Sequence, residues 1–367
     1  MTVTVAALRE TAASERRVAI VPEVVKKLRA SGVEVLLERD AGVSAGFPDD
    51  AYEGATFDDA EAVLARADLL WCLQMPEASR LAGLRRGSVL IGALQPHRHA
   101  ESLQRLAGQG VTAFALELLP RTTRAQAMDI LSSQAAVAGY RAMLIAAEHC
   151  PKFFPMLTTA AGTIRPSRVL VIGAGVAGLQ AIATARRLGA QVEGYDVRSE
   201  TREQVQSLGA KFLELGVDAA GKGGYARELS AEERAAQQQA LADHLAGIDV
   251  VVTTAAVPGR PAPRILTQAM VEGMKPGALV VDLAAEGGGN CELTRPGEQI
   301  DHRGRTVIGP LNLASGAAFH ASQMFARNVQ HFSALLLGED GVLLDFDDEL
   351  LARSCVVHDG EVRFTAG

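Results

Sequence analysis

The feature that most constrains the fold is a glycine-rich turn between two hydrophobic segments. Residues 169–172 are branched and apolar, and Gly173, Gly175 and Gly178 follow in a G-x-G-x-x-G pattern. The apolar, alanine-rich segment 179–185 comes next. This order predicts a buried strand, a tight turn and a helix, whose free N–H groups and dipole favour an anion such as a pyrophosphate.

Asp196 supplies the context that separates a dinucleotide site from an ordinary glycine turn. A second predicted strand, residues 191–195, ends at this acid, eighteen residues after Gly178. A carboxylate at that place is suited to accept hydrogen bonds from the adenosine ribose hydroxyls of NAD(H). The expected pyrophosphate and ribose contacts are Gly173, Gly175, Val176, Gly178 and Asp196.

Composition argues against several classes of protein. The net charge is −7 and aromatic residues make up 4% of the 367 residues, so neither a basic surface nor base stacking favours nucleic acid as a partner. Four widely spaced cysteines without a C-x-x-C pair indicate reduced, buried thiols, and we expect no metal site. No signal-peptide pattern opens the chain, and the apolar stretch 135–147 is interrupted by Arg141 and is shorter than a membrane span. We therefore expect a soluble cytoplasmic protein without direct membrane insertion.

The rest of the chain alternates between short β-rich segments and helical patterns, which is typical of parallel α/β sheets. The predicted fold is α/β, with two Rossmann-like, doubly wound parallel-sheet domains joined by long helical segments. The first domain is expected to take residues 1–131 plus 312–367, with a connecting helix over 132–150 and the NAD(H)-binding domain over 151–311. The predicted strands are residues 34–37, 69–73, 88–92, 111–115, 169–172, 191–195, 211–213, 250–253 and 279–282, and the predicted helices include 22–30, 101–107, 125–148, 231–245, 268–274 and 322–337.

Two loops are placed where a ligand would bind. In a doubly wound sheet the ligand lies beyond the carboxyl ends of the strands, so loops 255–259 and 284–290 should border the cofactor. The glycine-rich insertion 217–230 is predicted to be a mobile loop. Loops 255–259 and 284–290 also have a simpler interpretation as connections without a ligand.

Several motifs closely resemble those of the NAD(H)-binding component of proton-translocating nicotinamide nucleotide transhydrogenase. The resemblance extends over almost the whole chain, and the related alanine dehydrogenases share the fold and some of the motifs. The motifs are residues 17–28, 121–134, 138–141, 196–198, 224–228, 275–277 and 286–291.

The resemblance implies roles for individual residues. Arg121, Asp129 and Ser132 would orient the nicotinamide and its carboxamide, and Gln126 would reach toward a second nucleotide. From the residues alone, Asp129 and Ser132 are equally consistent with a helix cap. Tyr225 would lie at the tip of a loop that closes over the nucleotide. Further cofactor contacts implied by the resemblance are Val197, Arg198, Gly224, Gln237 and Ala256.

The implied activity is hydride transfer from NADH to NADP⁺ bound on a partner subunit, in the Si/Re-specific proton-translocating class. Direct transfer between stacked rings needs positioning and exclusion of water rather than an acid or a base. The resemblance further implies a homodimer, active only with its NADP(H)-binding and membrane-spanning partner subunits. These partners would hold it peripherally at the inner membrane.

Two other interpretations remain open. An alanine dehydrogenase carries a substrate-binding lysine and a catalytic histidine where this chain has Cys72 and Gln95, and neither replacement supplies a cation or an acid–base group. A shifted alignment would bring His97 or His99 to the second position. A non-catalytic NADH sensor is the third possibility, and it would not need Gln126 to face a second nucleotide.

Overall fold

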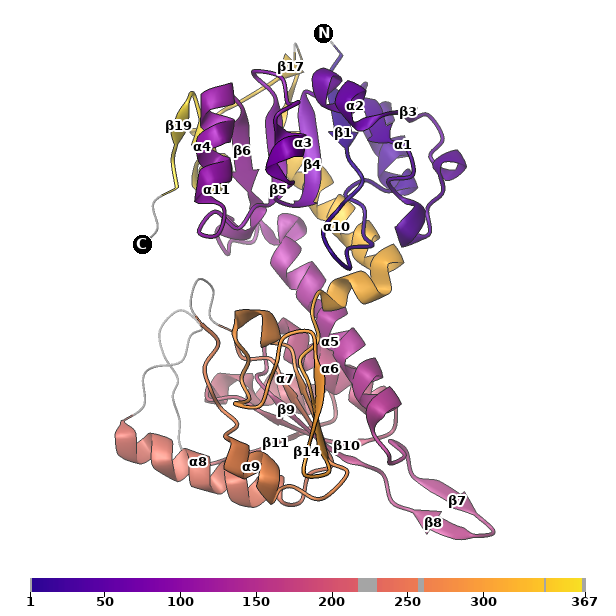
Figure 1. Cartoon of the computed structure of the whole chain (residues 1–367), viewed down its shortest axis with the longest axis vertical. Helices are drawn as coiled ribbons and strands as arrows, with labels where there is room; N and C mark the ends of the chain where they lie inside the picture. Colours follow the sequence, from indigo (N-terminus) through magenta and orange to yellow (C-terminus); the bar gives the residue numbers. More distant parts are fainter. Residues whose placement is uncertain (1, 217–229, 257–260, 340, 365–367) are drawn as a thin grey trace. The chain divides into compact units, whose positions relative to one another are not determined.

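The computed structural model describes residues 2–216, 230–256, 261–339 and 341–364, and these form two compact units (Figure 1). The first unit comprises Met1–Gln134 and Ala314–Gly367, and the second comprises Ala135–Leu313. Helix α5 (Ile130–His149) begins in the first unit and continues in the second.

The first unit is built on an eight-stranded sheet in the order β19-β18-β6-β5-β4-β1-β2-β3. Strands β1 to β6 are all parallel to one another. Strand β18 runs antiparallel to both β6 and β19. The order of the strands reverses at β1, which pairs with β2 on one side and β4 on the other. The strand bounds are β1 Thr4–Ala7, β2 Glu34–Glu38, β3 Thr56–Asp58, β4 Leu69–Gln74, β5 Val89–Ala93, β6 Thr112–Ala115, β18 Cys355–His358 and β19 Glu361–Val362.

Helices cover both faces of this sheet because alternate strand residues are apolar on both sides. One core includes Leu28 of α1 and Phe325 of α10, and the other includes Val63 of α2 and Leu106 of α4. This two-faced burial is the physical meaning of a doubly wound sheet. The helix bounds are α1 Pro22–Ala30, α2 Ala60–Arg66, α3 Ala78–Leu81, α4 Ala100–Gln109, α10 Ala318–Ser333 and α11 Glu349–Ser354.

The second unit contains a seven-stranded sheet in the order β11-β10-β9-β12-β13-β15-β14, parallel except for the edge strand β14. Helices α5 and α6 pack on one face through Met143 and Ile182, and α8 and α9 pack on the other through Leu241 and Met270. The strand bounds are β9 Arg168–Ile172, β10 Gln191–Tyr195, β11 Lys211–Phe212, β12 Val250–Thr253, β13 Leu279–Asp282, β14 Gln299–His302 and β15 Arg305–Ile308. The helix bounds are α6 Val176–Arg187, α7 Arg202–Ser207, α8 Ala231–Leu245 and α9 Gln268–Gly273.

The structure departs from the predicted elements in several places. The helix expected over 125–148 is a short 3-10 turn (Gln126–Met128) followed by α5. The two are separate because the Asp129 carboxylate caps the N-terminus of α5. The segment between α5 and β9, where no strand is predicted, contains an antiparallel hairpin, β7 (Leu157–Thr159) with β8 (Gly162–Ile164). A second two-stranded sheet joins β16 (Leu337–Gly338) and β17 (Gly341–Val342).

The apolar stretch 135–147 lies inside the longer helix α5. Its 20 residues meet the criteria of length and hydropathy for a membrane-spanning helix. Core helices of soluble proteins meet the same criteria, and Met143 and Ala146 of α5 are fully buried in the second unit.

Gly139 shows how closely α5 approaches the start of α6. A Cβ atom at Gly139 would lie 2.0 Å from the Ala177 carbonyl oxygen, whereas one at Gly108 in α4 would meet no heavy atom within 4 Å. We expect Gly139→Ala to destabilise the chain by about 1–3 kcal/mol through overpacking. The matched Gly108→Ala variant should be neutral or stabilise by up to about 1 kcal/mol, as usual for a helical glycine. Urea unfolding of both variants checks this, and equal effects would contradict it.

Candidate functional site

The glycine turn lies between β9 and α6, and each of its glycines has a separate physical reason. Gly173 has φ of +98° and donates its N–H to the Tyr195 carbonyl at 2.7 Å. A Cβ at Gly178 would lie 1.8 Å from the Gly173 carbonyl oxygen, so only glycine lets α6 start this close to β9. Around Gly175 no heavy atom lies within 4 Å of such a Cβ. That open space is what the approach of a pyrophosphate to the backbone requires.

Asp196 lies at the end of β10 and is bound to the turn and to Arg198. Its Oδ2 accepts hydrogen bonds from the Ala174 N–H at 2.8 Å and from Arg198 Nη2 at 2.9 Å. Its Oδ1 accepts from the N–H and the Nε of Arg198, both at 2.9 Å. Burial alone would raise the pKa of Asp196, but the hydrogen bonds from Arg198 and Ala174 lower it below the usual value. The Arg198 charge is therefore neutralised by this carboxylate.

Among the described residues, three others predicted around the cofactor lie in the second unit. Gln237 on α8 donates to the Tyr195 hydroxyl at 2.5 Å, one residue before Asp196. Val197 packs partly buried against the core, and Ala256 is exposed after the end of β12. Two predicted contacts lie outside the described residues, namely Gly224 and Tyr225.

The predicted nicotinamide segment lies in the first unit and includes the N-terminus of α5. Asp129 Oδ1 accepts the Ser132 N–H at 2.9 Å, and its Oδ2 accepts the Ser132 hydroxyl at 2.6 Å. Asp129 therefore caps the N-terminus of α5 through Ser132, which is the helix-cap interpretation of this pair. Arg121 and Gln126 are exposed on the preceding residues. The structure thus brings Asp129 and Ser132 together and leaves both partly accessible.

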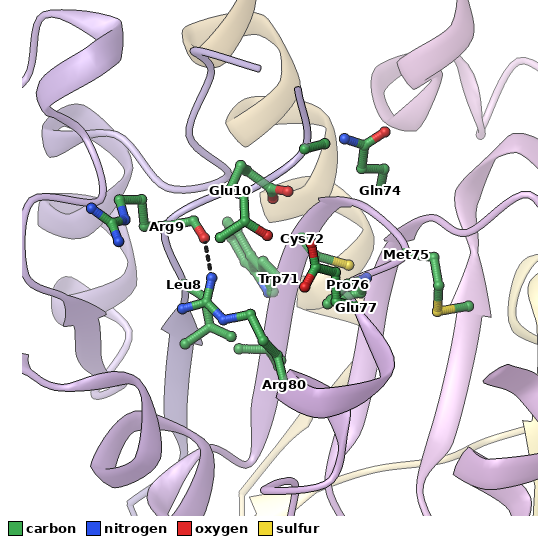
Figure 2. Close-up of a pocket in the computed structure, with 13 residues that line it drawn as sticks. Leu8, Arg9, Glu10, Trp71, Cys72, Gln74, Met75, Pro76, Glu77 and Arg80 are labelled. Carbon is green, nitrogen blue, oxygen red and sulfur yellow. Dashed lines mark hydrogen bonds between the residues drawn. The ribbon is translucent and has the colours of Figure 1, made fainter. Parts of the chain in front are cut away.

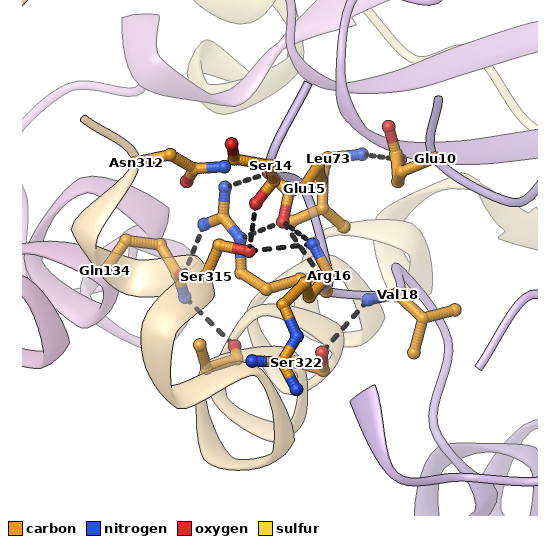
Figure 3. Close-up of polar contacts among 12 residues, drawn as sticks. Glu10, Ser14, Glu15, Arg16, Val18, Leu73, Gln134, Asn312, Ser315 and Ser322 are labelled. Atoms are coloured by element: carbon orange, nitrogen blue, oxygen red, sulfur yellow. Dashed lines mark hydrogen bonds and ion pairs between the residues drawn. The ribbon is translucent and has the colours of Figure 1, made fainter. Parts of the chain in front are cut away.

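A buried ion pair between Arg17 and Glu15 is hydrogen-bonded to Gln134 of α5, and Figure 3 shows Glu15 and Gln134. Arg17 donates from Nε and Nη2 to the two carboxylate oxygens of Glu15, at 2.8 and 2.7 Å, and from Nη1 to Gln134 Oε1 at 2.7 Å. Gln134 in turn donates to the Ala321 carbonyl at 3.1 Å. The Glu15 side chain is fully buried, so this bidentate pair is sheltered from water. The residue that starts the 17–28 motif is therefore engaged in holding α5.

A small cavity of about 90 Å³ lies beside the carboxyl ends of β1 and β4 (Figure 2). Glu10 lines it and accepts the Leu73 N–H at 2.6 Å, and burial raises the pKa of Glu10 to about 7. Arg80 on the cavity wall donates to the Arg9 carbonyl at 2.6 Å and pairs with Glu38. Cys72 also lines the cavity, and burial raises the pKa of its thiol. Cys72 therefore contributes a neutral thiol to a wall on which Arg80 supplies a guanidinium.

The second position that separates the two families is occupied by Gln95. This residue has φ of +44°, and its N–H donates to Glu117 Oε1 at 2.5 Å. The neighbouring histidines lie in the loop before α4, where His97 is exposed and His99 is half-buried. Burial lowers the pKa of His99, so its imidazole is neutral at pH 7.

The cysteines behave as predicted. All four are buried and free of disulfides. In the described ranges, no group of three or more His, Cys, Asp or Glu side chains is arranged to hold a metal ion.

The loops after β12 and β13 are held by polar residues that the sequence motifs do not single out. Asp282 and Asn290 are fully buried, and Thr254 donates its hydroxyl to the Gly173 carbonyl at 3.1 Å. The available signal was an acid at the end of a strand of branched residues, followed by three glycines and an asparagine.

The chain matches two family profiles along most of its length. Residues 6–138 match "Alanine dehydrogenase/PNT, N-terminal domain", and residues 142–365 match "Alanine dehydrogenase/PNT, C-terminal domain". The first part of the NAD(P) transhydrogenase alpha subunit of Rhodospirillum rubrum is 44% identical over 368 residues, covering 96% of each chain. A transhydrogenase crystal structure from Sinorhizobium meliloti is 43% identical and superposes with a TM-score of 0.90, covering 98% of this chain and 99% of that one. Alanine dehydrogenase 1 of Staphylococcus aureus is 27% identical over 300 residues, 80% of this chain and 75% of that protein. The chain therefore belongs to the alanine dehydrogenase/PNT family, within which it is homologous to the transhydrogenase alpha subunit and only distantly related to alanine dehydrogenase.

Proposed function

We propose that this chain binds NADH in a proton-translocating nicotinamide nucleotide transhydrogenase and that hydride passes from it to NADP⁺ on a partner subunit. The observation that carries the proposal is the open glycine turn beside Asp196, in a chain 44% identical to a transhydrogenase alpha subunit. An NAD(H)-type ribose fits a carboxylate at Asp196, whereas a 2′-phosphate would meet its negative charge.

The residues have separate tasks in this proposal. N–H groups at the start of α6 bind the pyrophosphate, and Asp196 binds the adenosine ribose. Asp129 and Ser132 hold the carboxamide together with Arg121, and Gln126 contacts the second nucleotide. Bound NADH supplies a hydride from C4 of its reduced ring to C4 of the NADP⁺ ring, and this step moves no proton. The chain therefore needs only to set distance and orientation and to exclude water.

The proposal includes partners of two kinds. One subunit binds NADP(H), and membrane-spanning subunits carry out proton translocation, so the chain is cytoplasmic and peripheral to the inner membrane. Transfer is of the Si/Re-specific type and requires the NADP(H)-binding partner. The name of the Rhodospirillum rubrum relative, which designates the first portion of an alpha subunit, supports an assembly of several chains. The roles that the resemblance implies for Gly224 and Tyr225 fall outside the described residues.

A homodimer is also included in the proposal, and the β7–β8 hairpin supports it. Every residue of both strands is exposed, and the hairpin extends away from the sheet of the second unit (Figure 1). Its apolar side chains are among the large exposed ones, with Met156 at 65% and Ile164 at 48% of their maximal exposure. A second copy of the chain would remove this apolar surface from water.

The first prediction separates this function from its alternatives. The purified chain should bind NADH without reducing NAD⁺ in the presence of alanine, because Cys72 and Gln95 supply neither a cation nor an acid–base group. Mixed with an NADP(H)-binding partner subunit, it should exchange hydride between NADH and an NADP⁺ analogue, followed by absorbance. Alanine-dependent reduction would support an alanine dehydrogenase instead, and NADH binding without exchange would support a sensor.

A second prediction concerns Gln126. Gln126→Asn shortens an exposed side chain proposed to contact the second nucleotide, so hydride transfer should fall at least tenfold while the Kd for NADH stays within about twofold. The matched control is Gln104→Asn on the exposed surface of α4, which should change neither value. Equal losses of transfer and NADH affinity in Gln126→Asn would contradict the role.

A third prediction uses the Asp196–Arg198 pair. Asp196→Asn removes the negative charge, so the Kd for NADH should rise about tenfold or more from the loss of a charge-assisted hydrogen bond. The released Arg198 guanidinium can then pair with a 2′-phosphate, and NADPH should bind more tightly than to the parent chain. Fluorescence titration with both nucleotides measures the change. The Asp196→Asn/Arg198→Ala double variant should lose the gain, and an unchanged NADPH affinity in the single variant would refute the pairing.

A further inference from the structure

Asp282 is a fully buried carboxylate at the carboxyl end of β13, and it lies at the centre of a hydrogen-bond network. Its Oδ1 accepts the Thr253 hydroxyl at 2.9 Å and the Ala284 N–H at 3.0 Å. Its Oδ2 accepts the N–H of Asn290 at 2.7 Å, the N–H of Cys291 at 3.0 Å and the Thr294 hydroxyl at 2.6 Å. All five donors are neutral, and four of them come from the loop that follows β13.

The glycine run of this loop is shaped around that carboxylate. Gly288 and Gly289 have φ of +101° and +88°, in the left-handed region. A Cβ at Gly289 would lie 2.8 Å from Asp282 Oδ2, so a side chain at this position would push the loop away from the carboxylate. The loop therefore returns to Asp282 immediately before Asn290.

Asn290 carries the network to the loop that follows β12. Its Oδ1 accepts the Ala255 N–H at 3.0 Å, and its Nδ2 donates to the carbonyls of Ala255 and Pro263, both at 2.8 Å. The side-chain amide thus pairs with both backbone groups of Ala255, in the way that a neighbouring β-strand would. Asn290 is fully buried, so water does not compete for these bonds.

The Ala255 backbone lies against the glycine turn. The Thr254 hydroxyl donates to the Gly173 carbonyl at 3.1 Å, and a Cβ at Gly173 would be 3.4 Å from the Ala255 nitrogen. Asp282 is thereby connected through Asn290 and Ala255 to Gly173, the first glycine of the turn. A hydrogen-bond network that only stabilised the hydrophobic core would not need to extend to the glycine turn at the carboxyl end of β9.

We propose that Asp282 and Asn290 are positioning residues for the dinucleotide, because they hold the backbone of residues 254–256 at the distance from the Gly173 turn that the nucleotide requires. The inference rests on the proposed binding of NADH by this chain. Asp282 acts through Asn290, and neither side chain contacts the nucleotide itself.

The test combines hydrogen exchange with NADH affinity. Asn290→Ala removes the acceptor of the Ala255 N–H, so exchange of a peptide covering residues 251–256 should accelerate at least tenfold in mass spectrometry. The Kd for NADH should rise at least fivefold. Asp282→Asn places donors opposite donors and should have the same two effects. If Asn290→Ala does not fold, Asn290→Ser provides the same comparison with a smaller polar side chain.

A matched control separates positioning from loss of stability. Asp249 is another buried carboxylate of the second unit, but it lies at the amino end of β12, where it accepts Lys152 Nζ at 2.5 Å and the Arg168 N–H at 2.9 Å. Asp249→Asn should lower the melting temperature while the exchange of residues 251–256 and the Kd for NADH remain at parent values. Equal effects of Asp249→Asn and Asn290→Ala on that Kd would overturn the proposal.

A double variant tests the order of action. Because Asp282 acts through Asn290, the Asp282→Asn/Asn290→Ala chain should bind NADH about as weakly as the weaker single variant. Multiplicative losses would overturn the proposed connection, as would unchanged hydrogen exchange in Asn290→Ala. The exchange measurement needs no nucleotide, so a parent chain that failed to bind NADH would count against the proposed function alone.

Discussion

The close approach of Gly178 to the Gly173 carbonyl is the constraint on which the second unit depends. Because no side chain fits between them, α6 begins directly over the end of β9 and directs its free N–H groups toward the open side of Gly175. The strand order then places β10 and β12 on either side of β9. Asp196 and Thr254, which are far apart in the chain, consequently both bond to the same turn, through Ala174 and Gly173. One steric requirement at a single pair of residues therefore organises three segments of the binding edge.

Buried carboxylates stabilise that edge in a particular way. Asp196 and Asp282 each lie at the carboxyl end of a strand and accept backbone N–H groups from the loop that follows or from the neighbouring turn. Such bonds make the loops at the strand ends rigid without the help of large hydrophobic side chains. Large side chains there would fill the space that a nucleotide needs. Asp249, at the opposite end of the sheet, accepts the Arg168 N–H and the side-chain ammonium of Lys152. Aspartate thus stabilises a surface segment at the amino ends of the strands and holds loops at their carboxyl ends.

The sequence was informative where a structure is specified by neighbours along the chain. Branched apolar residues predicted β9, β12 and β13, and the capping pair Asp129–Ser132 was one of the interpretations that the spacing allowed. The sequence was less informative about strands at the lateral edges of the sheets. Strands β18, β19 and β14 pair antiparallel, and the β7–β8 hairpin stands apart from the main sheets, because such strands are selected by the partner available in space rather than by their own composition. The break before α5 was missed because one hydrogen-bonding side chain outweighed the helical propensity of its neighbours.

By itself, the sequence determined the glycine turn, the strand that precedes it and the acid at the end of the next strand, since each depends on backbone angles and on spacing of a few residues. It also carried the family resemblance through motifs distributed along the whole chain. Only the tertiary structure decided that Arg17 is held by Gln134, that Thr254 bonds to the Gly173 turn, and that Asn290 reaches Ala255. The reason is that hydrogen-bond partners of buried polar groups are chosen by the packing of segments distant in sequence, which desolvates them and leaves each one a single set of neighbours.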